Sequence, residues 1–328
     1  MSSPSTGRTK AGISSSASGR DSNGRLMAAF PDFRPLGLED REFIREVLWR
    51  YQPDTSELTF TNLFIWRSLY RSRWSTAGQW LLLLQEKEGD EPSLLPPVGP
   101  SPRLAVTRLA LGWLREERGV QRPRIERADS RLIQELSAAP ELEVIPEREH
   151  FDYAYRTSDL IALKGAKYHA KRNHISRFLQ DHGTRFRFVP LGPENLELCA
   201  EFQERWCEWR RCDEDMNLRD EWTAIRQSLT DYQALKVEGA AILIGEKVEA
   251  FTFGELLNAQ TAVVHIEKAN PEIPGLYAMI NRQFCEEYWS GVPFINREQD
   301  LGEEGLRKAK LSYHPVRLVE KFQVELAE

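Results

Sequence analysis

Residues 240–289 of the chain read AAILIGEKVEAFTFGELLNAQTAVVHIEKANPEIPGLYAMINRQFCEEYW. Three strand-like runs follow one another closely in this stretch: 240–244, 248–257 and 262–267. The Gly245-Glu246 pair between the first two runs is typical of a hairpin turn. A helix is expected from Pro274 to Trp289, because apolar residues recur there at helical spacing. This order predicts an antiparallel meander that leads directly into a helix.

The segments on either side of the meander are expected to complete one unit, residues 149–328. Strands are expected at 151–156, 185–190, 293–296 and 316–325, and helices at 158–181, 193–210, 218–231 and 302–311. A pair of helices, a meander, and then a strand, a helix and a strand is the order of the GNAT (N-acyltransferase) fold. Ferredoxin-like and other α/β sandwiches share much of this order, so the pattern alone leaves them open.

Residues 27–148 also alternate strands and helices, and we interpret them as a more diverged copy of the same fold. The chain is therefore expected to be α/β (α+β), with two tandem GNAT-like domains, each a mixed sheet flanked by helices. Residues 1–26 are rich in Ser and Gly and are expected to form a disordered tail.

The composition excludes several classes of protein. Of the 328 residues, 41% are hydrophobic and the formal net charge is −6, so neither a wholly disordered chain nor a globally basic nucleic-acid-binding protein is expected. No apolar run approaches the roughly 20 residues of a membrane span, and the N-terminus lacks the apolar segment of a secretory signal. The four cysteines show no metal-ligand spacing, which predicts buried free thiols, no bound metal and a cytoplasmic protein.

The stretch KGAKYHAKRNHISR, residues 164–177, concentrates basic side chains on one face of an expected helix. Lys167, Lys171, His174 and Arg177 recur at spacings of four, three and three, so they share one helical face, and Arg172 flanks it. Such a face suits the phosphate groups of CoA, of tRNA or of a lipid head. The alternative is an ordinary solvated helix surface.

The stretch HIEKANPEIPGLY, residues 265–277, leads from a strand into a helix that begins at a Pro-Gly pair. The backbone N–H groups of Gly275 and Leu276 are a candidate cradle for a phosphate or a carboxylate. Glu255 and Glu267 lie on consecutive strands and are expected to project into one groove beside it. The alternatives are an ordinary helix start and a Glu267 that pairs with a surface cation.

The stretch NREQDLGEEGLRKAKLSYHP, residues 296–315, crowds polar side chains at the end of a short strand, where α/β sheets commonly bind ligands. Asp300 is a candidate to orient an attacking amine or to accept its proton. The other candidates are three cations that could hold an anion and a tyrosine that could donate a proton to a leaving oxygen: Arg297, Arg307, Lys310 and Tyr313. The alternative is a loop followed by a salt-bridged helix.

The chain resembles the family known as the phosphatidylglycerol lysyltransferase C-terminal domain, formerly a domain of unknown function. The resemblance lies in LTFTNLFIWR (58–67), LIALKGAKYHAKRNHISRF (160–178), AFTFGE (250–255), VHIEKANPEIPGLYAMIN (264–281) and INREQDLGEEGLRKAKLSYHP (295–315). It implies two tandem GNAT-type domains and kinship with aminoacyl-phosphatidylglycerol synthases and Fem-type peptide ligases, which take an aminoacyl group from charged tRNA. IEKANPEIPGLY stands in place of an acetyl-CoA loop of the form Q/R-x-x-G-x-G/A.

We therefore predict an enzyme, a cytosolic acyltransferase that moves an aminoacyl group from charged tRNA to an amine or hydroxyl of a small molecule, a peptide or a lipid head. Glu267 and Asp300 are predicted to act as acid/base groups or to orient the amine, with Glu255 nearby. Gly275 and Leu276 are predicted to bind the phosphate of the donor, and Lys167, Lys171 and Arg172 to bind the tRNA. The side chains expected beside the transfer point are Arg297, Arg307, Lys310 and Tyr313. The alternative donor is acyl-CoA. The alternative class is a non-catalytic module that binds an anionic ligand.

Overall fold

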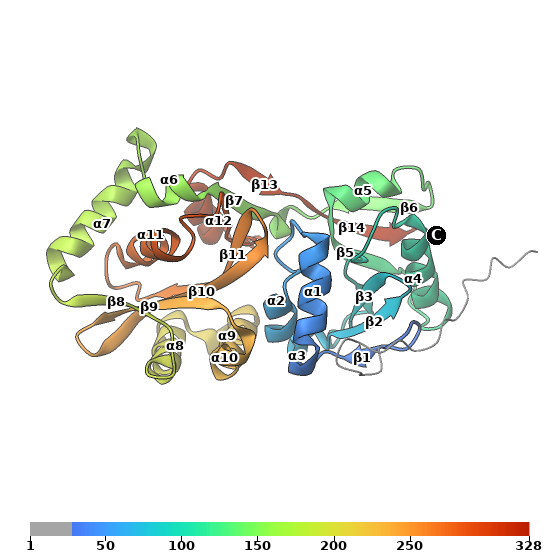
Figure 1. The fold of residues 1–328 in the computed structure, drawn as a ribbon, viewed down its shortest axis with the longest axis horizontal. Coiled ribbons are helices and arrows are strands. Elements are labelled where there is room, and N and C mark those ends of the chain that lie inside the picture. The colour runs from blue at the N-terminus through green and yellow to red at the C-terminus, as the bar shows by residue number, and fades with distance from the viewer. Residues whose placement is uncertain (1–27, 328) are drawn as a thin grey trace, which may run out of the picture.

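The computed structural model describes residues 28–327, which form two α/β units side by side (Figure 1). The predicted tail, residues 1–26, lies outside the described residues. Each unit contains one seven-stranded sheet that mixes parallel and antiparallel strands and is flanked by helices. The predicted fold class, two tandem GNAT-like domains, is confirmed. No helix within residues 28–327 has the length and apolar character that crossing a membrane requires.

The first unit follows the chain from β1 to β6. Its elements are β1 (Arg34–Pro35), α1 (Arg41–Tyr51), α2 (Phe60–Ile65), α3 (Arg67–Tyr70), β2 (Arg73–Ala77), β3 (Trp80–Gln85), β4 (Ser93–Leu94), α4 (Leu104–Glu116), β5 (Arg124–Asp129), α5 (Ser130–Leu136) and β6 (Leu142–Pro146). Thr59 begins α2 as its N-cap, because its side chain accepts a hydrogen bond from the backbone N–H of Asn62.

The second unit contains the predicted meander as three paired strands, β9 to β11. Its elements are β7 (Asp152–Arg156), α6 (Thr157–Ala162), α7 (His169–His182), β8 (Phe186–Pro190), α8 (Leu196–Arg210), α9 (Met216–Thr230), α10 (Tyr232–Leu235), β9 (Glu238–Ile244), β10 (Lys247–Asn258), β11 (Thr261–Ala269), α11 (Leu276–Tyr288), β12 (Phe294–Asn296), α12 (Glu304–Leu311) and β13 (Arg317–Val319). The chain then enters β14 (Lys321–Leu326).

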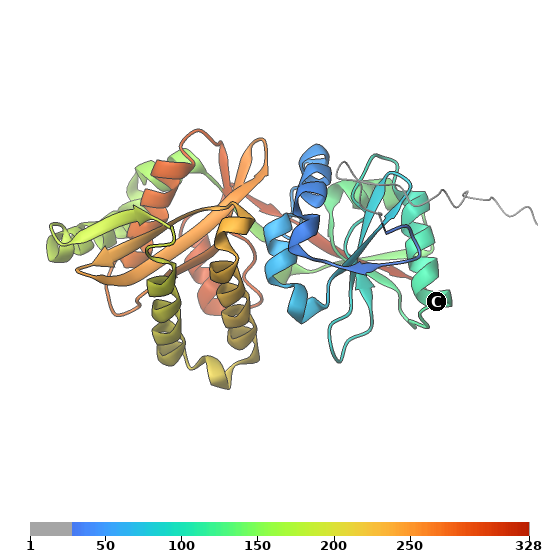
Figure 2. The same cartoon turned by 60° about the horizontal axis from the view of Figure 1, so that its bottom comes forward.

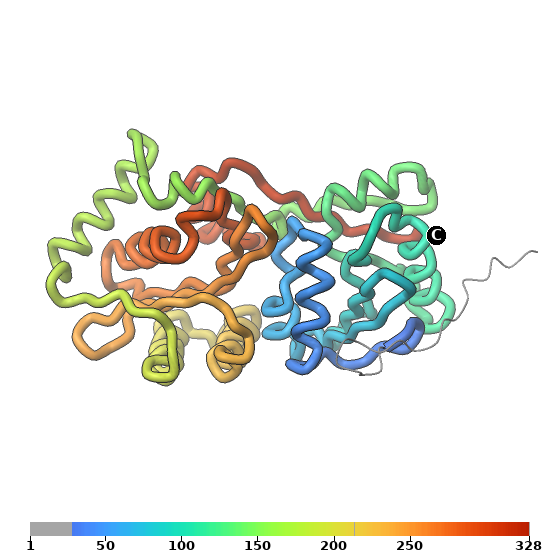
Figure 3. Tube along the Cα trace, viewed as in Figure 1, coloured from blue at the N-terminus to red at the C-terminus, as the bar shows by residue number. Residues whose placement is uncertain are grey.

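The strand orders show that the two units exchange a strand. The orders are β1-β2-β3-β4-β5-β14-β6 and, read from the other edge, β8-β9-β10-β11-β12-β7-β13. The two orders match position by position. In both, the fourth and fifth strands are parallel, and the sixth is antiparallel to both of its neighbours. β7 therefore completes the second sheet, and β14 returns to complete the first (Figure 3).

This exchange corrects two expectations. The single strand expected at 316–325 is two strands, β13 and β14, which belong to different sheets. The division into 27–148 and 149–328 describes the sequence order, but the first sheet is complete only with residues 321–326. Alternating apolar residues indicate that a segment buries one face as a strand, but they do not specify the sheet that it joins.

The two exchanged strands meet at a buried ion pair. Lys321 begins β14, Asp152 begins β7, and the Lys321 Nζ lies 2.6 Å from the Asp152 Oδ1, with both side chains 0% exposed. Lys321 also donates to Glu57 at 2.7 Å, and Asp152 accepts hydrogen bonds from the backbone N–H and the hydroxyl of Ser56. Groups from both units therefore satisfy the charges at the crossing point.

The two faces of the second sheet are covered differently (Figures 1 and 2). Helices α6, α7 and α11 pack on one face, and α8, α9 and α10 pack on the other. The apolar core on the second of these faces continues into the first unit, since it contains Phe60 and Phe64 of α2 together with Phe202 of α8 and Phe251 of β10. The first unit therefore closes part of this face.

The prediction that all four cysteines are free thiols is wrong for one pair. Cys207 and Cys212 form a disulfide at the end of α8, whereas Cys199 and Cys285 are free and buried. The backbone of Arg211 is left-handed, which ends α8 and turns the chain back so that Cys212 reaches Cys207. The spacing of the two cysteines in the sequence does not reveal this turn.

Candidate functional site

Strands β11 and β12 diverge after a short stretch of parallel pairing, which comprises three residue pairs. Beyond these pairs, Arg297 Nη2 lies 2.8 Å from Glu267 Oε1, and His265 Nδ1 lies 2.9 Å from Glu298 Oε1. Two side-chain ion pairs thus join the two strands where backbone pairing stops. We call this group of four residues, His265, Glu267, Arg297 and Glu298, the wedge.

A β-bulge in β11 turns the side chains of His265 and Glu267 toward different partners. The register between β10 and β11 shifts after Phe253, which leaves His265 as an extra residue. Beyond the bulge, Glu267 points toward α11, where it accepts a hydrogen bond from Asn281 at 2.8 Å. Glu255 instead lines a cavity together with residues of α1 and α2 of the first unit. The prediction that Glu255 and Glu267 share one groove is therefore wrong.

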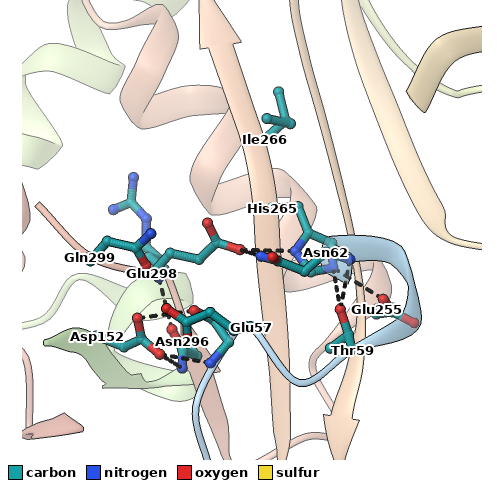
Figure 4. Close-up of polar contacts among 12 residues, drawn as sticks. Glu57, Thr59, Asn62, Asp152, Glu255, His265, Ile266, Asn296, Glu298 and Gln299 are labelled. Carbon is teal, nitrogen blue, oxygen red and sulfur yellow. Dashed lines mark hydrogen bonds and ion pairs between the residues drawn. The ribbon is translucent and has the colours of Figure 1, made fainter. Parts of the chain in front are cut away.

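On the side of the first unit, His265 lies between two carboxylates (Figure 4). Its Nε2 is 3.1 Å from Glu255 Oε1, and its Nδ1 is 2.9 Å from Glu298 Oε1. Helix α2 adds Asn62, whose Nδ2 donates to Glu298 at 3.2 Å. The hydroxyl of Thr59 lies 3.5 Å from His265 Nε2. Side chains of both units therefore build this half of the site.

The two carboxylates keep His265 protonated at neutral pH. Burial alone would lower the pKa of His265, but its hydrogen bonds to Glu255 and Glu298 raise that pKa to about 9. Burial raises the pKa of Glu255, but the hydrogen bond from His265 outweighs it and lowers this pKa. The imidazole is therefore a cationic donor and not a base. Sequence reasoning gave no role to His265 or Glu298, although a histidine inside the apolar run 263–266 was an available signal.

On the side of α11, two cations gather around Tyr313. Lys171 Nζ lies 3.9 Å from the centroid of its ring, and Arg297 Cζ lies 4.8 Å from the same point. Burial, with Arg297 nearby, lowers the pKa of Lys171 to about 8. Burial raises the pKa of Tyr313, so the phenol keeps its proton. Arg297 Nη1 is buried and has no hydrogen-bond partner among the described residues. Glu267 joins this group through its ion pair with Arg297. Four predicted site residues therefore meet here: Lys171, Glu267, Arg297 and Tyr313.

Lys310 holds the backbone of two wedge residues in place. Its Nζ donates to the backbone carbonyl of Arg297 and, at 3.1 Å, to that of Glu298. Burial lowers the pKa of Lys310 to about 8. The side chain is committed to these two carbonyls, so it positions Arg297 and Glu298 instead of holding a ligand anion as predicted. The carbonyls lie on a different segment from α12, so helical spacing could not indicate them.

Asp300 is anchored outside the wedge. Its side chain is 0% exposed and accepts two hydrogen bonds from Arg307, both at 2.9 Å, together with one from the hydroxyl of Tyr153 and one from Arg148. Burial raises the pKa of Asp300, but the hydrogen bonds from Arg307 outweigh it and lower this pKa to about 2. No hydrogen bond in the described part of the chain joins Asp300 or Arg307 to a wedge residue. The acid/base role predicted for Asp300 is therefore replaced by a structural one.

We expect Asp300→Asn to lower the free energy of unfolding by about 2 kcal/mol at neutral pH, because an amide cannot accept the paired charged hydrogen bonds of Arg307. The folded-state pKa is lowered, so the stabilisation is present above pH 3.8 and is lost as the pH falls through about 2. Urea unfolding of both proteins should show a difference that shrinks as the pH falls from about 4 to about 2. A difference that stays constant over this range would contradict the charged role of Asp300.

The helix start at Gly275 is closed by α7. Gly275 has a φ of +87°, and a Cβ at this position would collide with the backbone carbonyl of His174. Glycine therefore permits α7 to pack closely on α11. The N–H of Leu276 donates to the carbonyl of Ile273 at 3.3 Å. The structure does not support the phosphate cradle predicted at Gly275 and Leu276. Nor do residues 28–327 include a group of three or more His, Cys, Asp or Glu side chains that could hold a metal ion.

The basic helix expected at 158–181 is interrupted, because Leu163 and Gly165 have positive φ between α6 and α7. Arg172 donates to the carbonyls of both residues and so stabilises this turn. Lys167 is exposed and lies over the ring of the neighbouring tyrosine. Of the three side chains predicted to bind tRNA, Lys171 lies at the wedge.

Comparisons with known proteins agree with this fold. A family model described as "Phosphatidylglycerol lysyltransferase, C-terminal" matches residues 49–325. The crystal structure of a conserved protein of unknown function from Bacteroides thetaiotaomicron VPI-5482 is 33% identical, with a TM-score of 0.84 over 90% of this chain and 99% of that one. The structure of L-PGS from Bacillus licheniformis is 13% identical, with a TM-score of 0.61 over 92% and 93%. An uncharacterized protein of Mycoplasmoides gallisepticum is 20% identical over 186 residues, and the match spans 57% of this chain and 59% of that protein's length.

Proposed function

Because the chain belongs to the family of the phosphatidylglycerol lysyltransferase C-terminal domain, we propose that it is an aminoacyltransferase with charged tRNA as the donor and an amine or hydroxyl as the acceptor. One observation carries the proposal. Arg297 presents a buried, unpartnered cationic N–H beside Glu267 and Tyr313, just beyond the last backbone pair of β11 and β12. Glu267, Tyr313 and Arg297 thus bring a carboxylate, a phenol and a guanidinium together at the point where we propose that the acyl group is held.

The reaction needs no covalent intermediate. The acceptor attacks the acyl carbon, the new amide or ester bond forms, and the ester bond to the tRNA ribose breaks. Negative charge develops on the carbonyl oxygen, and Arg297 Nη1 is a donor available to stabilise it. Glu267 orients the acceptor and takes its proton, and Tyr313 supplies a proton to the leaving ribose oxygen. Holding the two reactants together supplies much of the remaining rate.

The charge distribution supports a polyanionic donor. Residues 164–187 contain seven Lys and Arg residues and one acidic residue, in a chain whose formal net charge is −6. Most of these basic side chains are exposed, including Lys164 and Lys167, while Lys171 at the inner side of α7 is half-buried against Tyr313. A basic surface therefore leads along α7 to the wedge. The closed helix start at Gly275 counts against acyl-CoA as the donor, because the segment IEKANPEIPGLY that leads into it stands in the place of an acetyl-CoA loop.

We expect the double variant Lys164→Ala/Lys167→Ala to weaken tRNA binding and to flatten its salt dependence. Each lost phosphate contact should reduce the slope of log K against log salt by about 1, so the double variant should lose about 2. Filter binding at several salt concentrations measures this slope. Lys87→Ala, which removes an exposed lysine of the first unit, is the matched control and should leave the slope unchanged. An unchanged slope in the double variant would exclude the turn between α6 and α7, which carries both lysines, from the tRNA surface.

The proposed reaction is tested by incubating the full chain with a mixture of tRNAs that carry labelled amino acids, together with amine, peptide and lipid acceptors. We expect label to leave tRNA and appear in one class of acceptor, and no transfer from labelled acyl-CoA. Transfer from acyl-CoA alone would favour the alternative donor. Specific tRNA binding without any transfer would favour the non-catalytic module.

A further inference from the structure

Asn296, the last residue of β12, connects the crossing of the exchanged strands to the wedge. It is 0% exposed, its Nδ2 donates to Asp152 Oδ2 at 2.9 Å, and its Oδ1 accepts from the backbone N–H of Glu298 at 2.8 Å. Figure 4 shows the three residues next to one another. A carboxylate only accepts hydrogen bonds and a backbone N–H only donates, so the two contacts together fix which end of the amide points which way.

Asp152 is a firm anchor for this amide. Its two oxygens accept hydrogen bonds from Lys321 at 2.6 Å, from the N–H and the hydroxyl of Ser56 at 2.9 and 3.0 Å, and from Asn296. A carboxylate accepts about four hydrogen bonds, so the capacity of Asp152 is filled. Lys321 begins the strand that returns to the first sheet, and Ser56 belongs to the first unit. Through Asn296, the crossing of the two units therefore reaches the backbone of the wedge.

Glu298 needs this support, because its backbone is left-handed, with a φ of +55°. A residue with a Cβ rarely adopts this conformation, and it persists only where the surroundings enforce it. The carbonyl of Glu298 accepts hydrogen bonds from the N–H of Tyr153 at 3.2 Å and from Lys310 at 3.1 Å. The N–H of Glu298 has the Asn296 side chain as its partner, and an asparagine that bonds the N–H two residues further on closes a turn.

This turn decides where the side chain of Arg297 points. Arg297 pairs with Glu267 at 2.8 Å, on the side of α11. The next residue, Glu298, pairs with His265 at 2.9 Å, on the side of the first unit. Consecutive side chains thus serve opposite halves of the site, and the left-handed backbone between them makes this possible. A relaxed turn would displace Arg297 Nη1, the donor of the proposed reaction.

We propose that Asn296 is a positioning residue, which holds Arg297 in its orientation by tying the N–H of Glu298 to the Asp152 carboxylate. Asn296 itself touches no substrate. The inference rests on the proposed function only for the role of Arg297 as the donor to the acyl oxygen. The contacts of Asn296, and therefore its effect on the orientation of Arg297, are independent of the reaction.

Two substitutions separate the two contacts of Asn296. Asn296→Ala removes both. Asn296→Ser keeps a hydroxyl that can accept from the N–H of Glu298, but it loses the donor to Asp152 because the side chain is shorter. Asn217→Ala, which truncates an exposed asparagine of α9, is the matched control. Thermal melts establish which of these variants are folded.

NMR spectra of the full chain, prepared with isotope-labelled arginine, report on Arg297 without any substrate. A guanidinium held by a carboxylate gives separate signals for its two Nη groups, whereas one that rotates gives an averaged signal. We expect separate signals for Arg297, identified by their loss in Arg297→Gln, in the natural chain and in Asn217→Ala. The signals should be averaged in Asn296→Ala and broadened in Asn296→Ser.

Single-turnover transfer from saturating charged tRNA measures the consequence for the reaction. We expect Asn296→Ala to lower the rate by about 10²-fold, the loss that follows when a group is misplaced by about 1 Å. Asn296→Ser should lose less, because it keeps the turn. The affinity for tRNA should stay the same in both variants, since a general loss of structure would lower rate and affinity together.

Unchanged Arg297 signals or a natural transfer rate in a folded Asn296→Ala would overturn the proposal. If Asn296→Ala does not fold, the same two measurements on Asn296→Ser decide, and natural values there would overturn it. Averaged Arg297 signals in Asn296→Ala, together with a natural chain that transfers nothing from any charged tRNA, would contradict the proposed function and leave the positioning role standing. Lost transfer with unchanged Arg297 signals would do the reverse.

Discussion

Lys321→Met is expected to lower the free energy of unfolding by about 3 to 5 kcal/mol, because it leaves buried carboxylates without their cation. Lys321 contacts Asp152 at 2.6 Å and Glu57 at 2.7 Å, and its side chain is 0% exposed. The three residues come from β14, β7 and the first unit, so the loss falls where the two exchanged strands cross. Urea unfolding followed by circular dichroism at neutral pH measures it.

Two further variants make this prediction specific. Lys308→Met removes an exposed lysine of α12 and should change stability by no more than about 0.5 kcal/mol. Adding Asp152→Asn to Lys321→Met removes one of the uncompensated charges and should recover part of the loss, since residues in contact are not additive. A loss below about 1 kcal/mol in Lys321→Met would show that the ion pair does not hold the exchanged strands together.

Arg297→Gln is expected to reduce the rate of aminoacyl transfer by about 10² to 10³-fold, the effect of removing one donor to a developing oxyanion. The substitution removes the unpartnered Nη1 and also the 2.8 Å ion pair with Glu267. Arg297→Lys should recover little, because one ammonium cannot satisfy Glu267 and face the carbonyl oxygen with the geometry of a guanidinium. Single-turnover transfer from saturating charged tRNA measures the chemical step.

Arg282→Gln is the matched control for this prediction. Arg282 lies on α11, its side chain is 38% exposed, and it pairs with Glu286 on the same helix. We expect its transfer rate to stay close to that of the natural chain. Thermal melts of all three variants show whether a lost rate reflects a lost fold. A folded Arg297→Gln that transfers at nearly the natural rate would place the reaction elsewhere.

Much of the fold follows from local sequence patterns. The runs at 240–244, 248–257 and 262–267 are the strands β9, β10 and β11, because alternation, β-branched residues and a Gly-containing turn act over a few residues. The same holds for α11, whose apolar stripe packs on the sheet. The polar segment after β12 was likewise visible, and it supplies Arg297 and Tyr313 to the site.

The predicted roles were less secure than the predicted positions. Asp300 and Lys310 stand in the segment that the sequence indicated, yet both are committed to protein partners. His265 and Glu298 had no predicted role, because their importance lies in contacts with each other and with α2. A titratable residue shows its type in the sequence, but its partners determine whether it can act on a ligand.

The sequence by itself determined most of the helices and strands, the meander and the family resemblance, because these depend on the spacing of residues close together in the chain. The tertiary structure decided the rest. The exchange of β7 and β14 rests on Lys321 and Asp152, which are 169 residues apart. The bulge at His265 and the closing of Gly275 by α7 depend on strand register and helix packing. The ion pair, the strand register and the helix contact all form only when separate segments meet in the folded chain. The local periodicity of the sequence therefore does not predict them.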